Sequence, residues 1–171
     1  MTHHEFICGD AQQAMQTLPS ESVHCIVTSP PYWGLRNYHV DGQLGQEGTP
    51  EEYVENLVKV FREAKRVLRD DGTLWLNLGD SYASGGMSNP SSKSTLGGGK
   101  DLGAADYSIT RKVPNGLKPK DLVGIPWLVA FALRADGWYL RSDVVWEKTN
   151  AMPESVTDRP TRAHEYVFLM S

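Results

Sequence analysis

The sequence has few cysteines, no long apolar run and no excess of positive charge. Cys8 and Cys25 are too few for a disulfide scaffold, and their apolar neighbours predict reduced, buried thiols in a cytoplasmic protein. No apolar run approaches the roughly 18 residues of a membrane helix, and residues 1–5 lack the basic and apolar regions of a secretory signal. The formal net charge of -4 excludes nucleic-acid binding by overall charge alone, so any DNA contact must be local or come from residues outside this chain.

The 171 residues, 40% of them hydrophobic, fit one globular domain (residues 1–171) with its own core. Helical spacing and capping signals alternate with β-branched and apolar runs, which favours an α/β fold with a doubly wound sheet. The last two strands have no helical crossover between them and are expected to pair antiparallel. The expected strands are 6–8, 23–28, 73–78, 138–146 and 163–170, and the expected helices are 11–18, 50–69 and 121–134.

A change in composition separates the expected strand 73–78 from the helix at 121–134. Seven of the chain's 16 glycines lie between Ser81 and Leu117, together with repeated serines. This pattern predicts a long Gly/Ser-rich loop over residues 81–117, and loops of this length are usually functional or disordered.

The sharpest chemical feature is Thr28-Ser29-Pro30-Pro31-Tyr32 at the end of an apolar, β-branched run. The prolines end the strand and stiffen the backbone, and ligands of open α/β sheets bind outside the carboxyl ends of strands. Ser29 offers a hydroxyl and Pro30 a carbonyl as hydrogen-bond acceptors, and Tyr32 offers a flat face beyond them. This set suits the exocyclic amine of a planar base. A surface turn with an exposed aromatic is an equal alternative from residue types alone.

The motif resembles the catalytic motif of the DNA amino-methyltransferases, which transfer a methyl group from S-adenosylmethionine to cytosine N4 or adenine N6. Residues 6–11, 72–82, 136–148 and 162–170 are similar to further blocks of that family, in the same order. The resemblance implies a Rossmann-like methyltransferase sheet with helices on its faces, and site-specific methylation of double-stranded DNA in restriction–modification. Ser29 favours cytosine N4, because adenine N6 enzymes of the family more often carry Asp at that position; adenine N6 remains the alternative.

The resemblance also implies a direct transfer, with Ser29, Pro30, Pro31 and Tyr32 as the catalytic residues. The base leaves the helix stack, its amine donates to the Ser29 hydroxyl and the Pro30 carbonyl, and Tyr32 stacks on its ring. Neither cysteine is expected to act as a nucleophile.

Weaker signals indicate other contacts. Asp10 and Asp80 each follow a strand end and are candidates for cofactor binding, with ordinary turn aspartates as the alternative. His164-Glu165 is expected to be a structural pair, and no metal site is expected. The candidates for DNA contact are Trp33, Lys93, Lys100, Arg111 and Lys112.

One family element is absent from the sequence: the Phe-x-Gly-x-Gly loop that holds the methionine end of the cofactor. Gly97-Gly98-Gly99 does not replace it, because no apolar strand precedes it. We therefore expect a sheet that is incomplete at its C-terminal side, with uncovered apolar surface, a missing segment or second chain, and poor binding of S-adenosylmethionine by these residues alone. The alternatives are an inactive remnant, an accessory DNA-binding subunit, or an RNA or protein-amide methyltransferase, which more often carries Asn at the position of Ser29.

Overall fold

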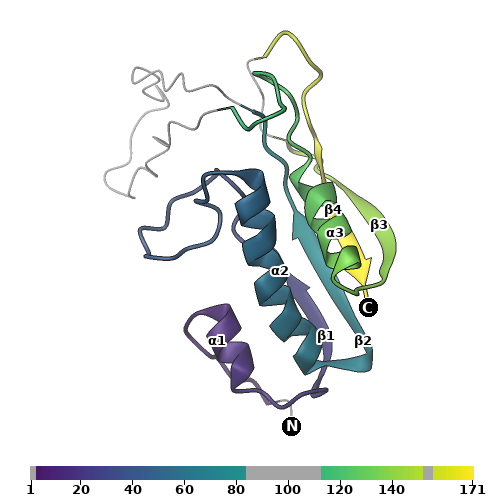
Figure 1. Cartoon of the computed structure of the whole chain (residues 1–171). Coiled ribbons are helices and arrows are strands. Elements are labelled where there is room, and N and C mark those ends of the chain that lie inside the picture. Colours follow the sequence, from purple (N-terminus) through teal and green to yellow (C-terminus); the bar gives the residue numbers. More distant parts are fainter. Residues whose placement is uncertain (1–2, 84–112, 152–155) are drawn as a thin grey trace, which may run out of the picture.

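The computed structural model describes residues 3–83, 113–151 and 156–171, and Figure 1 shows an open sheet with helices packed against it. Residues 84–112, the greater part of the expected loop, lie outside the described residues. The helices are α1 (Ala11–Gln16), α2 (Pro50–Val67) and α3 (Ile125–Ala135), and the strands are β1 (Val23–Thr28), β2 (Leu68–Leu78), β3 (Leu140–Glu147) and β4 (His164–Met170).

The four strands lie in the order β1-β2-β4-β3. β1 pairs parallel with β2, and β4 lies antiparallel to both β2 and β3. The α/β class and the antiparallel final pair are thus confirmed. β4 lies beside β2, and Leu78 pairs with Tyr166. The preceding residue of β4, Glu165, reaches the segment that follows β1, with its Oε2 3.0 Å from the Tyr32 hydroxyl.

Helix α2 begins as its sequence predicts and ends two residues earlier. The Thr49 side chain accepts from the Glu52 backbone while the Glu52 side chain accepts from the Thr49 backbone, and Pro50 follows in the first turn. The helix stops at Val67, and β2 starts at once at Leu68. Val23 pairs with Leu68 and Cys25 with Thr73, so the expected turn at residues 70–72 is an irregular part of β2.

All three described helices pack on one face of the sheet, which differs from the expected cover on both faces. Leu74, Leu76 and Leu78 of β2 are fully buried in a core shared with α2 and α3. The alternate residues point to the opposite face, where Val27 is 78% exposed and Trp146 52% exposed. The expectation of uncovered apolar surface is therefore confirmed for the described residues.

Three local predictions are wrong. Residues 6–8 form no strand, and Phe6 is 95% exposed, because this segment pairs with no strand of the sheet. Cys8 and Cys25 are exposed free thiols; Cys25 lies on the uncovered face of β1, where apolar neighbours in sequence do not bring burial. The helix expected from Asp121 starts at Ile125, after Gly124 in a left-handed conformation.

Within the described residues, no helix combines the length and the apolar character that crossing a bilayer requires.

Candidate active site

The diproline corner follows β1 at its carboxyl end and is held from behind by α2. The phenol of Tyr53, buried in α2, donates a 2.8 Å hydrogen bond to the Pro31 carbonyl. Gly45 lies so close that a Cβ there would be 2.8 Å from the Tyr32 carbonyl oxygen, and its φ of +90° also favours glycine. The corner is therefore fixed by contacts with α2 and the 45–47 turn.

A pocket of about 270 Å³ opens at this corner, lined by Ser29, Pro30, Pro31, Tyr32, Leu35, Arg36 and Tyr38. Ser29 is exposed, and the Pro31 carbonyl is occupied by Tyr53. The structure thus brings Ser29 and Pro30, the residues expected to supply the two acceptors, to one accessible pocket.

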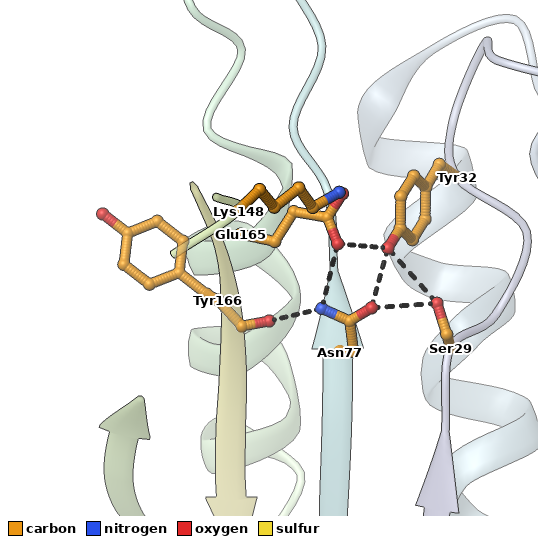
Figure 2. Close-up of polar contacts among 6 residues, drawn as sticks. All are labelled: Ser29, Tyr32, Asn77, Lys148, Glu165 and Tyr166. Atoms are coloured by element: carbon orange, nitrogen blue, oxygen red, sulfur yellow. Dashed lines mark hydrogen bonds and ion pairs between the residues drawn. The ribbon is translucent and has the colours of Figure 1, made fainter. Parts of the chain in front are cut away.

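Behind the pocket, a polar network joins the corner to the neighbouring strands (Figure 2). The Tyr32 hydroxyl lies 2.9 Å from Asn77 Oδ1 and 3.0 Å from Glu165 Oε2. The Ser29 hydroxyl donates to the same Asn77 oxygen at 3.2 Å and lies 3.3 Å from the Tyr32 hydroxyl. Lys148, just beyond β3, pairs with the other oxygen of Glu165. Sequence reasoning missed Asn77, Lys148 and Glu165 as parts of this site.

The ring of Tyr32 lies directly against Gly79, the residue after β2. A Cβ on Gly79 would be 2.5 Å from Cε2 of Tyr32 and 2.8 Å from its Cδ2. Glycine is therefore required at position 79 because a side chain would collide with the Tyr32 ring, and not because of an unusual backbone conformation. With the phenol bound at its far end and Gly79 beside it, the ring of Tyr32 has one defined position.

Electrostatics assign proton positions in the network. Burial raises the pKa of Tyr32, and the nearby Glu165 carboxylate raises it further, so the phenol stays a hydrogen-bond donor near neutral pH. Burial also acts to raise the pKa of Glu165, but hydrogen bonds from Lys148, Tyr32 and Asn77 outweigh it, and the net pKa is lowered. Glu165 is therefore a carboxylate that accepts from Tyr32.

The lowered pKa of Glu165 predicts a pH-dependent stability. A carboxyl whose pKa is lower in the folded state stabilises the fold above its unfolded value, here about 4.5, and loses that contribution as pH falls through the folded value. Wild type should therefore exceed Glu165→Gln in free energy of unfolding at pH 7, and the difference should shrink as the pH falls below about 4.5. Urea unfolding of the two proteins across this range measures it; a difference that grows toward low pH would contradict the assignment.

The two aspartates predicted to bind a cofactor lie in different surroundings. Asp10 is exposed and caps α1, where its carboxylate accepts from the Gln13 backbone at 2.9 Å. Asp80 has a side chain only 2% exposed: one oxygen accepts from the backbone of Ser81, Gly124 and Ile125, and the other lies 3.3 Å from Arg162. Asp80, which follows β2, thus caps the start of α3. A cofactor contact by either remains a prediction.

Removal of this cap should destabilise the protein. Asp80→Ala leaves the amides at the start of α3 and the Arg162 guanidinium without their acceptor, and we expect it to lower the free energy of unfolding by about 2–3 kcal/mol. Asp143→Ala, at an exposed carboxylate in β3, is the matched control and should change stability by less than about 0.5 kcal/mol. Urea unfolding measures both; equal effects would show that Asp80 does not hold α3.

The expected DNA contacts receive little support. Trp33 is 3% exposed in the core, and its indole N–H donates to the Glu47 carbonyl, so its side chain presents no surface to DNA and that prediction is corrected. Lys93, Lys100, Arg111 and Lys112 lie outside the described residues. Arg36, at the pocket, is a basic residue that the sequence analysis did not select. In the described part of the chain, no three His, Cys, Asp or Glu side chains gather closely enough to hold a metal ion.

Comparison with known proteins gives close relatives over nearly the whole chain. The type II methyltransferase M.Cfr9I of Citrobacter freundii is 56% identical over 165 residues, which are 95% of this chain and 52% of the relative. The type II methyltransferase M.SmaI of Serratia marcescens is 54% identical over 167 residues, 98% of this chain and 55% of the relative. The chain spans about half the length of the curated relatives it matches.

Solved structures share the fold. The cytosine-N4-specific PvuII DNA methyltransferase superposes with a TM-score of 0.60 at 17% identity, over 95% of this chain and 47% of that one. A Thermus thermophilus protein that is described as a DNA modification methylase was solved in complex with S-adenosyl-L-methionine. It has a TM-score of 0.57 at 22% identity, over 95% of this chain and 50% of that one. The family model for N6/N4 DNA methylases matches residues 23–171, and the chain belongs to this DNA methylase family.

Proposed function

We propose that this chain forms the base-binding part of an S-adenosylmethionine-dependent methyltransferase that modifies the exocyclic amine of a base in double-stranded DNA. The observation that carries the proposal is the pocket at the end of β1, which Ser29 and Pro30 line together. Membership of the DNA methylase family supports the reaction class. Catalytic groups cannot reach the target atom of a base that is stacked inside a duplex, so we propose that the base is extruded into this pocket.

The two acceptors act on the hydrogens of the amine. The lone pair of an exocyclic amine is delocalised into the aromatic ring, which makes the nitrogen a weak nucleophile. Hydrogen bonds from its N–H groups to Ser29 Oγ and the Pro30 carbonyl hold the nitrogen in place and stabilise the positive charge that develops during attack. The nitrogen would form a bond to the methyl carbon as the carbon–sulfur bond of the sulfonium breaks with its electron pair left on sulfur, and one N–H proton would leave to solvent.

The cofactor supplies the methyl group when bound, and the described residues offer a place for it. A second, largely apolar cavity of about 280 Å³ lies on the helix side of the diproline corner, between the start of α1, β1 and α2. Ala11 lines this cavity, and the exposed Asp10 carboxylate precedes it. We propose that Asp10 binds a polar group of the cofactor, whereas the enclosed Asp80 positions α3.

Ser29 favours cytosine N4 over adenine N6 as the methylated atom. Arg36 is the basic residue among those that line the pocket and is our described candidate for a phosphate contact. The proposal also includes the basic residues that were expected to contact DNA and that lie outside the described part of the chain, Lys93 and Lys100 among them.

Nucleoside analysis of treated DNA tests the proposed function. The full chain, joined to the remaining part of the M.Cfr9I relative (the chimera), is incubated with DNA and S-adenosylmethionine, and the parent relative serves as the positive control. We expect N4-methylcytosine in DNA treated with the chimera. If N6-methyladenine were found instead, the assignment of the base would change from cytosine to adenine and the reaction class would stand. If a folded chimera left the DNA unmodified while the parent relative modified it, the proposal would be overturned.

A further inference from the structure

Glu165 and Lys148 have no part in the reaction as proposed so far, yet they end the hydrogen-bond network behind Ser29 (Figure 2). A serine hydroxyl has one proton and two lone pairs. To accept from an amine, Ser29 must direct that proton away from the pocket. The question is therefore which groups receive it, and what keeps them available.

The Asn77 oxygen is the nearer of two receivers, the other being the Tyr32 hydroxyl at 3.3 Å, and the orientation of the Asn77 amide is fixed. Its amide nitrogen donates to the Tyr166 carbonyl at 3.1 Å and to Glu165 Oε2 at 3.3 Å. The amide oxygen consequently faces the Ser29 and Tyr32 hydroxyls, at 3.2 and 2.9 Å. Without these two acceptors on the nitrogen side, the amide could turn over and present N–H groups to Ser29.

Tyr32 and Ser29 both lie within hydrogen-bond distance of the Asn77 oxygen, which has two lone pairs, and Glu165 offers the phenol a second, charged acceptor. The phenol has one proton and two possible acceptors, Asn77 Oδ1 and Glu165 Oε2. Hydrogen bonds to a charged acceptor are roughly twice as strong as neutral ones, so the phenol proton goes to the carboxylate. The Ser29 proton then goes to a group inside the network, the Asn77 oxygen or the oxygen of the Tyr32 phenol, and the lone pairs of Ser29 face the pocket.

Lys148 keeps the carboxylate charged and in place. It pairs with Oε1, which leaves Oε2 for Tyr32 and Asn77, and the Glu165 side chain is only 16% exposed. The contacts of the network thus run from Lys148 through Glu165 to Tyr32, and on through Asn77 to Ser29.

We propose that Glu165, held by Lys148, is a positioning residue that sets the proton directions of Tyr32, Asn77 and Ser29 so that Ser29 is an acceptor for the substrate amine. The inference rests on the proposed function. In Glu165→Gln, Lys148 would hold the new amide oxygen, and the amide N–H groups would face Tyr32 and the Asn77 nitrogen. The Asn77 amide would then turn over and present N–H groups to Ser29, which would direct the Ser29 proton into the pocket, against the N–H groups of the amine.

Kinetics of the chimera provide the first test. Glu165→Gln should lower kcat about 10-fold or more, with KM for DNA and cofactor affinity changed less than about 2-fold, because the reacting geometry is affected and the binding surface is not. Glu147→Gln, the same exchange at an exposed position of β3, is the matched control and should be neutral. Glu165→Asp, which retains the carboxylate, should recover part of the loss. An unchanged kcat in Glu165→Gln, with Ser29→Ala inactive, would overturn the inference and leave the proposed function standing; full activity in Ser29→Ala would overturn both.

Spectroscopy of the chain itself tests the network without catalysis. With ¹³Cζ-labelled tyrosine, the Tyr32 resonance is identified by its loss in Tyr32→Phe. At neutral pH we expect this resonance to shift in Glu165→Gln and to stay in place in Glu147→Gln, because the hydrogen bond of the phenol to a carboxylate is lost only in the first. A Tyr32 resonance unmoved in Glu165→Gln would contradict the inference whatever the activity of the chimera.

Discussion

Ser29→Ala in the chimera is expected to lower the rate of methyl transfer about 10²- to 10³-fold, the effect of removing one group placed where charge develops in a transition state. The substitution removes one of the two acceptors for the amine and leaves the Pro30 carbonyl. Ser29 lines both cavities, but alanine keeps the Cβ and removes only the hydroxyl, so affinity for the cofactor should change little. Single-turnover methylation of an oligonucleotide and calorimetric titration with the cofactor measure the two effects.

Ser142→Ala is the matched control, since Ser142 is an exposed serine of β3. It should retain the wild-type rate. If Ser29→Ala lost activity in proportion to a loss of cofactor affinity, Ser29 would belong to the cofactor site, and the assignment of the amine to this hydroxyl would be wrong.

Gly79→Ala is expected to cause the second large loss, about 10²-fold in methyl transfer, because a displacement of about 1 Å at a reacting site has effects of this size. The new Cβ would lie 2.5 Å from Cε2 of Tyr32, and the ring must move. Its hydroxyl would then leave Asn77 and Glu165. Overpacking of this kind should also lower the free energy of unfolding by about 1–3 kcal/mol.

Gly48→Ala provides the comparison, because a Cβ at Gly48 meets only the Glu52 side chain, at an ordinary 3.4 Å. Its activity should be that of wild type. Gly79→Ala with wild-type turnover would show that the position of the Tyr32 ring does not matter to the reaction.

The acceptors of the site could be predicted from the sequence because they are local. An apolar, β-branched run ending in Ser29-Pro30-Pro31 dictates both where the strand stops and which groups follow it. The capping box at Thr49 and Glu52 placed α2 for the same reason. These features depend on neighbours within a few residues.

The supporting network could not be predicted in this way. Asn77 lies 48 residues from Ser29, and Glu165 lies 133 residues from Tyr32. Their meeting depends on β4 entering the sheet beside β2 in one register, which no local pattern specifies. A polar Asn77 inside an otherwise apolar strand was the available signal, and Glu165 gave none beyond its place beside His164.

Burial was misjudged where it depends on which face of the sheet is covered. Cys25 and Val27 lie in a strand as apolar as a buried one, yet they point to the face without described helices. Asp80 shows the opposite case. It follows a strand in a turn, a position that left both a cofactor contact and an ordinary turn aspartate open, and the approach of α3 encloses its carboxylate.

The most direct test is a crystal structure of the chimera bound to duplex DNA and a non-reactive cofactor analogue. The account predicts one base outside the stack, its exocyclic nitrogen within about 3 Å of both Ser29 Oγ and the Pro30 carbonyl, and its ring on Tyr32. A base bound with its amine away from both oxygens would contradict it.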